Sequence, residues 1–272
     1  MRYERELRTA LEAARLAGQL ILTAYEQFTA IPDAKVDITT DADRQSQEAI
    51  LQHLQSAFPE DALCAEENTP TLVAGRKVAS RQWIVDPIDG TRGFAQKNGE
   101  FSVMIALCDG DRIVVGVVLE PVPARLTYAV LGAGCWRLDG AAAEPEKCQV
   151  SPTTDLTRAT LVQSRSRNPE IPSGPVRALQ PARVRETHSA GVKLALVARG
   201  DVDLYANTYT AFHDWDIAAG HILVVEAAGS VTGLKGETIR YGADGAWQRS
   251  GLLATNGKLE ADALHGLATL TS

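Results

Sequence analysis

The sequence lacks long apolar runs, basic clusters and a recognisable leader. No apolar run reaches the ~18 residues of a membrane span, so we expect no transmembrane helix. The net charge is -7 and no basic run occurs, which argues against nucleic-acid polymers and anionic membranes as partners. Residues 1–18 are amphipathic and charged, unlike a signal peptide.

The four cysteines show neither paired nor metal-type spacing: Cys64, Cys108, Cys135 and Cys148. We therefore expect reduced, mostly buried thiols and a cytoplasmic protein. An acidic protein that handled anionic phosphates would need metal ions to reverse the local charge.

The pattern of elements changes along the chain. Residues 4–28 carry apolar side chains at helical spacing. Short strands without intervening helices follow at 102–107, 113–119, 126–130 and 135–138, which predicts an antiparallel sheet covered by the N-terminal helices. Beyond a linker at 139–158, strands and helices alternate. We expect an α+β lobe over residues 1–150 and a smaller α/β lobe over 151–272.

Two finer predictions concern segments near the expected site. Residues 69–81 are polar and contain several charges, which favours a surface loop or flap. Residues 216–228 read as a helix, and Gly229 stands where a C-capping glycine belongs.

The most informative stretch runs from Trp83 to Leu107. The apolar run Trp83–Val85 predicts the end of a buried strand, and Asp86 and Asp89 follow it. Carboxylate oxygens are the ligands that Mg²⁺ prefers, and the glycine after Asp89 lets backbone approach a ligand closely. The alternative is an ordinary turn, because Asp-Pro and Asp-Gly are common turn signals.

Other acidic residues each have an ordinary structural interpretation. Asp43 stands in the first turn of a helix that Thr40 or Asp41 would cap. The adjacent pair Glu66 and Glu67 would suit a solvated loop, and Asp216 would suit a helix N-cap.

Two strings nevertheless carry a specific resemblance. Residues 83–94 read W-x-V-D-P-I-D-G-T-x-x-F, and residues 215–219 read W-D-x-A-A. Together they resemble the inositol monophosphatase superfamily, the lithium-sensitive, Mg²⁺-dependent phosphatases. The resemblance implies the layered αβαβα sugar-phosphatase fold. Most metal ligands would then lie in the first lobe, with Asp216 and the substrate loops in the second.

The resemblance also implies roles for individual residues. Two or three Mg²⁺ ions would be held by Glu66, Asp86, Asp89, Asp216 and the carbonyl of Ile88. Thr91, hydrogen-bonded to Asp43, would deprotonate a metal-bound water, which Glu67 would help to position. The phosphate would lie against Asp89, Gly90, Thr91 and Asp216.

Three further segments resemble the 3'(2'),5'-bisphosphate nucleotidase branch: residues 97–103, Ser164–Ser166 and Ser189–Lys193. The resemblance implies conversion of 3'-phosphoadenosine 5'-phosphate to AMP and phosphate, a reaction of sulfur metabolism. Ser164, Ser189 and Lys193 would hold the nucleotide, although a solvated lysine and two capping serines are the plain alternative. Arg167 stands where the branch has histidine; it could stack on adenine, grip a phosphate or signal another substrate.

Two alternatives to this function stay open. One is an inositol monophosphatase or a broad sugar-phosphate phosphatase. The other is a non-catalytic regulator that binds phosphorylated ligands on the same scaffold. In each case the expected partner is a small phosphate ester, and the chain would be a monomer or a homodimer.

Overall fold

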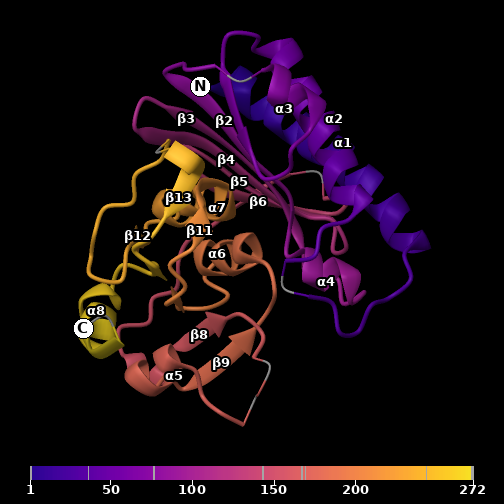
Figure 1. The fold of residues 1–272 in the computed structure, drawn as a ribbon. Coiled ribbons are helices and arrows are strands. Elements are labelled where there is room, and N and C mark those ends of the chain that lie inside the picture. The colour runs from indigo at the N-terminus through magenta and orange to yellow at the C-terminus, as the bar shows by residue number, and fades with distance from the viewer. Residues whose placement is uncertain are drawn as a thin grey trace.

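The computed structural model describes residues 2–35, 37–75, 77–142, 144–166, 168, 170–242 and 244–270. Helices and sheets alternate in five layers, helix–sheet–helix–sheet–helix (Figure 1). This is the fold class predicted from the sequence. Within the described residues, no helix combines the length and the apolar character needed to cross a membrane.

The first sheet has seven strands in chain order, with the first pair parallel and the others antiparallel. They are β1 (Ala62–Ala65), β2 (Arg81–Asp89), β3 (Ser102–Asp109), β4 (Arg112–Glu120), β5 (Arg125–Val130), β6 (Gly134–Asp139) and β7 (Glu146–Lys147).

Helices cover both faces of this sheet. On one face lie α1 (Glu4–Gln27) and α2 (Asp41–Ala57), and on the other α6 (Ala190–Ala198) and α7 (Asp214–Glu226). The alternation of side chains along β3 explains this. Val103, Ile105 and Leu107 pack with α1 and α2, while Met104, Ala106 and Cys108 face α6 and α7.

The second sheet contains five strands in the order β12 (Ser230–Thr232), β14 (Leu252–Thr255), β10 (Leu204–Asn207), β8 (Thr160–Gln163) and β9 (Arg183–Glu186). Helices α5 (Gly174–Leu179) and α8 (Glu260–Leu267) cover its outer face. A small antiparallel pair, β11 (Phe212–His213) and β13 (Trp247–Gln248), leads into α7. The remaining short elements are α3 (Pro70–Ala74), α4 (Thr91–Ala95), η1 (Leu156–Arg158), η2 (Asp244–Ala246) and η3 (Ala268–Leu270).

A bulge at the end of β2 decides where the two central aspartates point. Asp86 pairs with Met104 and Asp89 pairs with Ser102, so three steps on β2 match two on β3. In a regular strand, residues three apart lie on opposite faces. The bulge, which contains Pro87, changes this alternation and places both carboxylates on the sheet face that packs against α6 and α7.

The two finer predictions for loops and helix ends need correction. Within residues 69–81 the structure contains α3, which follows Thr69 and begins with Pro70. At the end of α7, the left-handed residue is Ala228, with φ 71°, and not Gly229. Gly229 is needed for a different reason, since a side chain there would meet the Thr255 carbonyl oxygen at 2.5 Å.

The contact between α6 and α7 depends on Gly220. A Cβ atom at this position would lie 2.5 Å from Leu194 Cβ. We expect Gly220→Ala to lower the free energy of unfolding by about 1–3 kcal/mol, although alanine favours helix. Urea denaturation would measure this. Gly174→Ala is the control, because its Cβ would meet only the end of a Leu270 side chain, at 3.3 Å, and a shift of a few tenths of an ångström would relieve that contact. Equal stability changes in both variants would contradict the packing argument.

Candidate active site

Asp86 is the most strongly perturbed carboxyl group of the site. Asp86 is 2 % exposed, and its Oδ1 atom is buried without a hydrogen-bond partner. Burial, followed by the negative charges of Glu66, Asp89 and Asp216, raises the pKa of Asp86 well above its usual value. A buried anion among other anions is stable only with a proton or a cation close by.

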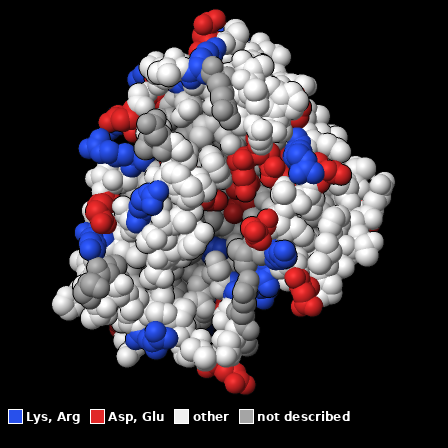
Figure 2. Space-filling model, viewed as in Figure 1, with Lys and Arg blue, Asp and Glu red and all other residues white. Residues whose placement is uncertain are grey.

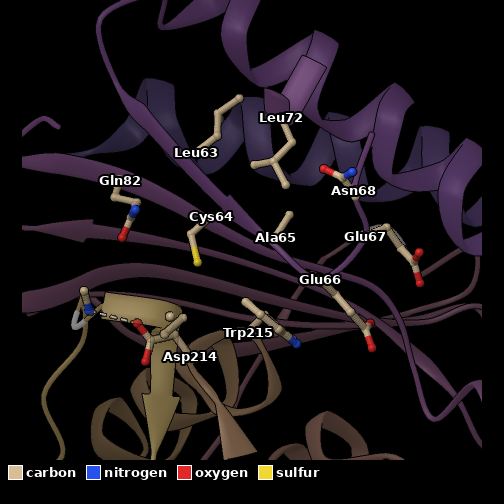
Figure 3. Close-up of a pocket in the computed structure, with 13 residues that line it drawn as sticks. Leu63, Cys64, Ala65, Glu66, Glu67, Asn68, Leu72, Gln82, Asp214 and Trp215 are labelled. Atoms are coloured by element: carbon tan, nitrogen blue, oxygen red, sulfur yellow. Dashed lines mark hydrogen bonds between the residues drawn. The ribbon is translucent and has the colours of Figure 1, made fainter. Parts of the chain in front are cut away.

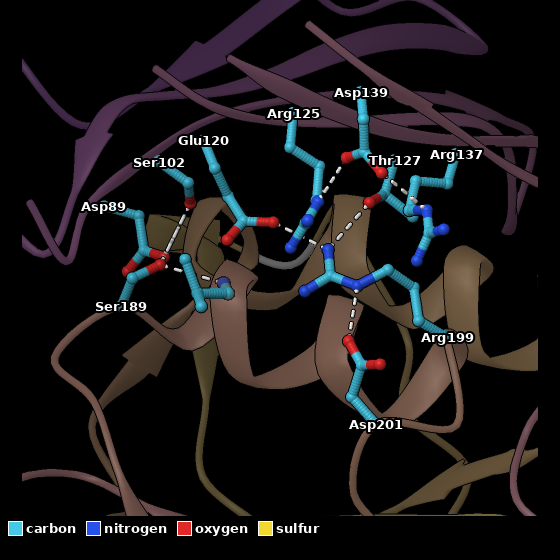
Figure 4. Close-up of polar contacts among 11 residues, drawn as sticks. Asp89, Ser102, Glu120, Arg125, Thr127, Arg137, Asp139, Ser189, Arg199 and Asp201 are labelled. Atoms are coloured by element: carbon cyan, nitrogen blue, oxygen red, sulfur yellow. Dashed lines mark hydrogen bonds and ion pairs between the residues drawn. The ribbon is translucent and has the colours of Figure 1, made fainter. Parts of the chain in front are cut away.

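Asp89 joins β2 to the start of α6. It accepts hydrogen bonds from the Ser189 hydroxyl, the Ala190 N–H at 3.0 Å, the Gly191 N–H at 2.6 Å and the Ser102 hydroxyl at 3.2 Å. Figure 4 shows this carboxylate beside Ser102 and Ser189. Burial raises the pKa of Asp89, and these hydrogen bonds oppose the shift. The N-terminus of α6 therefore holds the last carboxylate of β2.

Thr91 and Asp43 form the hydrogen bond predicted from the resemblance. The Thr91 Oγ1 atom lies 2.9 Å from Asp43 Oδ1 and 3.0 Å from the Ile88 carbonyl oxygen. The other Asp43 oxygen accepts from the Thr40 N–H at 2.8 Å and the Thr40 hydroxyl at 2.6 Å. Asp43 therefore belongs to the capping box of α2 and also bonds Thr91. Burial raises the pKa of Asp43.

Glu66 and Glu67 follow the end of β1 and face the cleft (Figure 3). Glu66 is open to the solvent of the cleft, but desolvation by the surrounding protein and the charges of Asp216 and Asp43 raise its pKa to about 8. The Glu67 Oε1 atom accepts a hydrogen bond from the Thr39 hydroxyl at 2.6 Å. This bond fixes the second glutamate beside the first.

Asp216 lies in the first turn of α7. Its Oδ2 atom accepts a hydrogen bond from the His213 N–H at 2.6 Å, which completes a capping box. The N-cap expected from the sequence is therefore wrong: His213 is the N-cap residue, and Asp216 is the third residue of the helix. The same side chain raises the pKa of both Glu66 and Asp86, so it also belongs to the acidic cluster.

Acidic side chains gather where this face of the molecule is hollowed, and basic side chains lie below them (Figure 2). Carboxylate oxygens are hard donors of the kind that divalent cations prefer, and one of them, buried on Asp86, has no hydrogen-bond partner. The chemistry of this cluster therefore suits a divalent cation. Among the described residues, no three His, Cys, Asp or Glu side chains converge into a finished ion site. A cation would therefore have to draw these carboxylates together: Glu66, Asp86, Asp89 and Asp216.

A cavity of about 550 Å³ borders this cluster. Glu66 and Glu67 form one side, and Cys64, Asp214 and Trp215 form much of the rest (Figure 3). The buried Asp214 is not free to bind, because it accepts from the Gly242 N–H at 2.8 Å and the Gln248 side chain at 2.7 Å.

The residues predicted to hold substrate differ in burial and in their contacts. Gly90 has φ 88°, and a Cβ atom there would lie 2.9 Å from the Glu100 carbonyl oxygen, so glycine is required. Ser189 is buried, caps α6 and bonds Asp89. Ser164 is exposed. Arg167 lies outside the described residues.

Lys193 is buried, and its ammonium group is fully used inside the protein. It donates to the carbonyl oxygens of Thr187 and His188 at 3.1 and 2.9 Å and to the Ser164 hydroxyl at 3.2 Å. Three acceptors leave no N–H for a phosphate in this arrangement. Burial lowers the pKa of Lys193 to about 8, while the charge of Asp89 opposes that shift.

The sequence prediction did not include several polar groups around the cleft. Arg165 donates two hydrogen bonds to Glu100, joining the loop before β3 to the loop after β8. The Nε atom of Arg92 is buried without a hydrogen-bond partner. Burial, and then the charges of Arg92 and Arg165, lower the pKa of His188, so each arginine acts on this ring. The sequence motifs that contain Arg165 and Glu100 were visible, but the sequence did not show that these two side chains would pair.

The family model described as the inositol monophosphatase family matches residues 3–270. The chain belongs to the inositol monophosphatase family. A curated relative, the 3'(2'),5'-bisphosphate nucleotidase CysQ of Salmonella typhimurium, is 32% identical over 243 residues, which cover 86% of this chain and 93% of the relative. The Nus factor SuhB of Pasteurella multocida is also 32% identical, with 85% of each chain covered.

Solved structures of the inositol monophosphatase family share the fold. The inositol monophosphatase from Anabaena is 27% identical, with a TM-score of 0.79 and coverage of 99% of this chain and 97% of that one. The Thermotoga maritima enzyme is 25% identical, with a TM-score of 0.81 and 98% of each chain covered. Family membership makes this protein a phosphatase of that fold, but relatives with different names are equally similar to it.

The raised pKa of Glu66 gives a testable dependence of stability on pH. The folded protein binds a proton at the Glu66 carboxyl group more tightly than the unfolded chain does. Without divalent cations, the free energy of unfolding should therefore fall as pH rises from about 4.5 to about 8. Urea denaturation in a chelator, between about pH 5 and about pH 8, would measure the slope.

Glu66→Gln should flatten that slope, and a divalent cation should restore stability at the upper end of the range. Glu67→Gln is the matched control, because its carboxylate is held by Thr39. If the two variants showed the same slope as the unmutated protein, Glu66 would not be the titrating group.

Proposed function

We propose that this protein hydrolyses a phosphate monoester with the help of Mg²⁺. The observation that carries the proposal is the hydrogen bond between Thr91 and Asp43, placed directly after the buried aspartates of β2. A hydroxyl that is hydrogen-bonded to a buried carboxylate can accept a proton from water and pass its own proton to that carboxylate. A binding protein would not need this pair.

The acidic cluster would hold the cation through Glu66, Asp86, Asp89, Asp216 and the carbonyl oxygen of Ile88. When bound, Mg²⁺ supplies Lewis-acid chemistry: it lowers the pKa of water and offsets negative charge on the phosphate and the leaving oxygen. Thr91 would orient the attacking water and Asp43 would take up its proton. Glu67, fixed by Thr39, would orient the same water.

The phosphate would bind against backbone rather than against a basic side chain. Gly90 and Thr91 open α4, so their N–H groups are free of helical partners. The left-handed glycine brings this backbone close to Glu100 and Ser189, so the loop is fixed on both sides.

We further propose 3'-phosphoadenosine 5'-phosphate as the substrate. Support comes from the CysQ relative and from the cluster of Arg92, Arg165 and His188 beside the site. Such a cluster suits a second phosphate that is not cleaved. Inositol phosphates are the second candidate, supported by the structural similarity to inositol monophosphatases and by equally similar SuhB relatives.

Phosphate release would discriminate between these substrates. We expect release from 3'-phosphoadenosine 5'-phosphate in Mg²⁺, none in a chelator, and a kcat/KM at least ~10-fold below it for inositol 1-phosphate, a difference of about 1.4 kcal/mol. Preference for inositol 1-phosphate would retain the hydrolase and overturn the nucleotide assignment. No Mg²⁺-dependent release from either ester would contradict both, and would favour a phospholigand-binding regulator.

The Thr91–Asp43 pair can be tested separately from the substrate. Thr91→Val removes the hydroxyl but keeps the side-chain shape, so kcat should fall by about 10²–10⁴-fold. Thr91→Ser keeps the hydroxyl and should stay within about tenfold of the unmutated protein. Thermal unfolding of both variants would check the fold. Equal activity of Thr91→Val and Thr91→Ser would show that the hydroxyl takes no part.

A further inference from the structure

Cys135 and Cys148 face each other at the far edge of the first sheet. Trp136 pairs with Lys147 and Arg137 with Glu146, so the next rung of the β6–β7 ladder places Cys135 opposite Cys148. The Cys148 N–H donates to the Cys135 carbonyl oxygen at 2.8 Å, which extends the pairing by that rung. The two cysteines are therefore cross-strand neighbours.

The two side chains point to the same side of the sheet. Directly opposed residues of an antiparallel pair share a face, and both cysteines belong to the buried cluster around α6 and α7. The two thiols are hydrogen-bonded to each other. Both are free thiols in this structure.

The backbone spacing suits a disulfide. Opposed residues in a hydrogen-bonded antiparallel rung have Cα atoms about 5.5 Å apart. Disulfides bridge Cα separations of about 4.4–6.8 Å. The cross-link would therefore need rotation of the two side chains but no movement of the strands.

The charge of Arg199 acts on both thiols. Its side chain is 1% exposed and bonds Glu120 at 2.6 Å, Thr127 at 3.0 Å and Asp201 at 2.9 Å (Figure 4). Its Nη2 atom is buried without a hydrogen-bond partner. Positive charge beside a thiol favours the thiolate, which is the reactive form.

The remaining cysteines lack this arrangement. Burial raises the pKa of Cys64 to about 12 and that of Cys108 to about 11. By contrast, the hydrogen bond from Cys135 and the charge of Arg199 lower the pKa of Cys148, while the same hydrogen bond raises that of Cys135. Cys148 is also the more exposed of the two residues, at 7% against 0% for Cys135.

We propose that Cys135 and Cys148 are a site of oxidative modification, at which a hydroperoxide converts the opposed thiols into a cross-strand disulfide. The Cys148 thiolate attacks one peroxide oxygen, the O–O bond breaks, and the departing oxygen takes up a proton. Cys148 becomes a sulfenic acid. The Cys135 sulfur then attacks the Cys148 sulfur, the S–O bond breaks and water leaves with the Cys135 proton. Two electrons pass from the thiols to the peroxide.

The disulfide would secure the chain where it leaves the first sheet. Residues after Cys148 continue into the second lobe, where the Val150 N–H bonds the Ala227 carbonyl oxygen at 3.1 Å and the Ser151 hydroxyl bonds Asp203 at 2.5 Å. Closing the loop from Cys135 to Cys148 restricts the unfolded chain, so the oxidised protein should unfold at a higher temperature than the reduced protein.

Peptide mapping of the full chain would test the site. The protein is treated with hydrogen peroxide, its free thiols are alkylated, and it is digested with trypsin without reductant. We expect the peptide of residues 126–137 joined to that of 148–158, two hydrogens lighter than their sum.

Two variants sharpen the result. Cys135→Ser should abolish the cross-link and leave a Cys148 sulfenic acid that dimedone traps, whereas Cys64→Ser should leave the cross-link unchanged. Recovery of both peptides unlinked and alkylated, after peroxide has oxidised other side chains, would overturn the proposal. The measurement on the unmutated protein does not depend on the folding of either variant.

Discussion

Mutual repulsion among buried carboxylates is the constraint on which the rest of this structure depends. Three of the acids reduce that repulsion with a helix N-terminus. Asp43 lies in the first turn of α2, Asp216 lies in the first turn of α7, and Asp89 accepts the first N–H groups of α6. Asp86 has no such helix and keeps an unpartnered oxygen. The charge that the helices leave uncompensated is therefore concentrated where a cation would bind.

The same carboxylates explain why the two sheets stay in one arrangement. Asp89 belongs to the first sheet, but its partners Ser189, Ala190 and Gly191 belong to the helix layer that faces the second sheet. The bulge at Pro87 makes this possible, because a regular strand would point Asp89 toward α1 and α2. The geometry of the site and the packing of α6 against the first sheet therefore both depend on the bulge at Pro87.

Apolar periodicity is a local signal, and the pairing of Thr91 with Asp43 was implied by the resemblance of their motifs to a known family, so much of the fold and this pair could be predicted from the sequence. The bulge could not, since Asp-Pro-Ile-Asp reads equally well as a turn. The helix within residues 69–81 has only five residues, Pro70–Ala74, which are too few to show helical periodicity. Lys193 illustrates a further limit: a sequence shows that a lysine is present but not that three protein acceptors already satisfy it. The opposition of Cys135 and Cys148 arises only from strand register.

Substrate choice then has to come from groups that Lys193 does not supply. Lys193 fixes the Thr187–His188 backbone, while Arg165 remains in the cleft with both of its hydrogen bonds made to Glu100. A second phosphate at Arg165 would replace a carboxylate in the same two-bond geometry, so little hydrogen bonding would be lost in the exchange. A neutral hydroxyl of inositol could not make that replacement, because it cannot offset the charge that Glu100 now neutralises. If the nucleotide is the substrate, selectivity at this site would depend on how readily Glu100 releases Arg165.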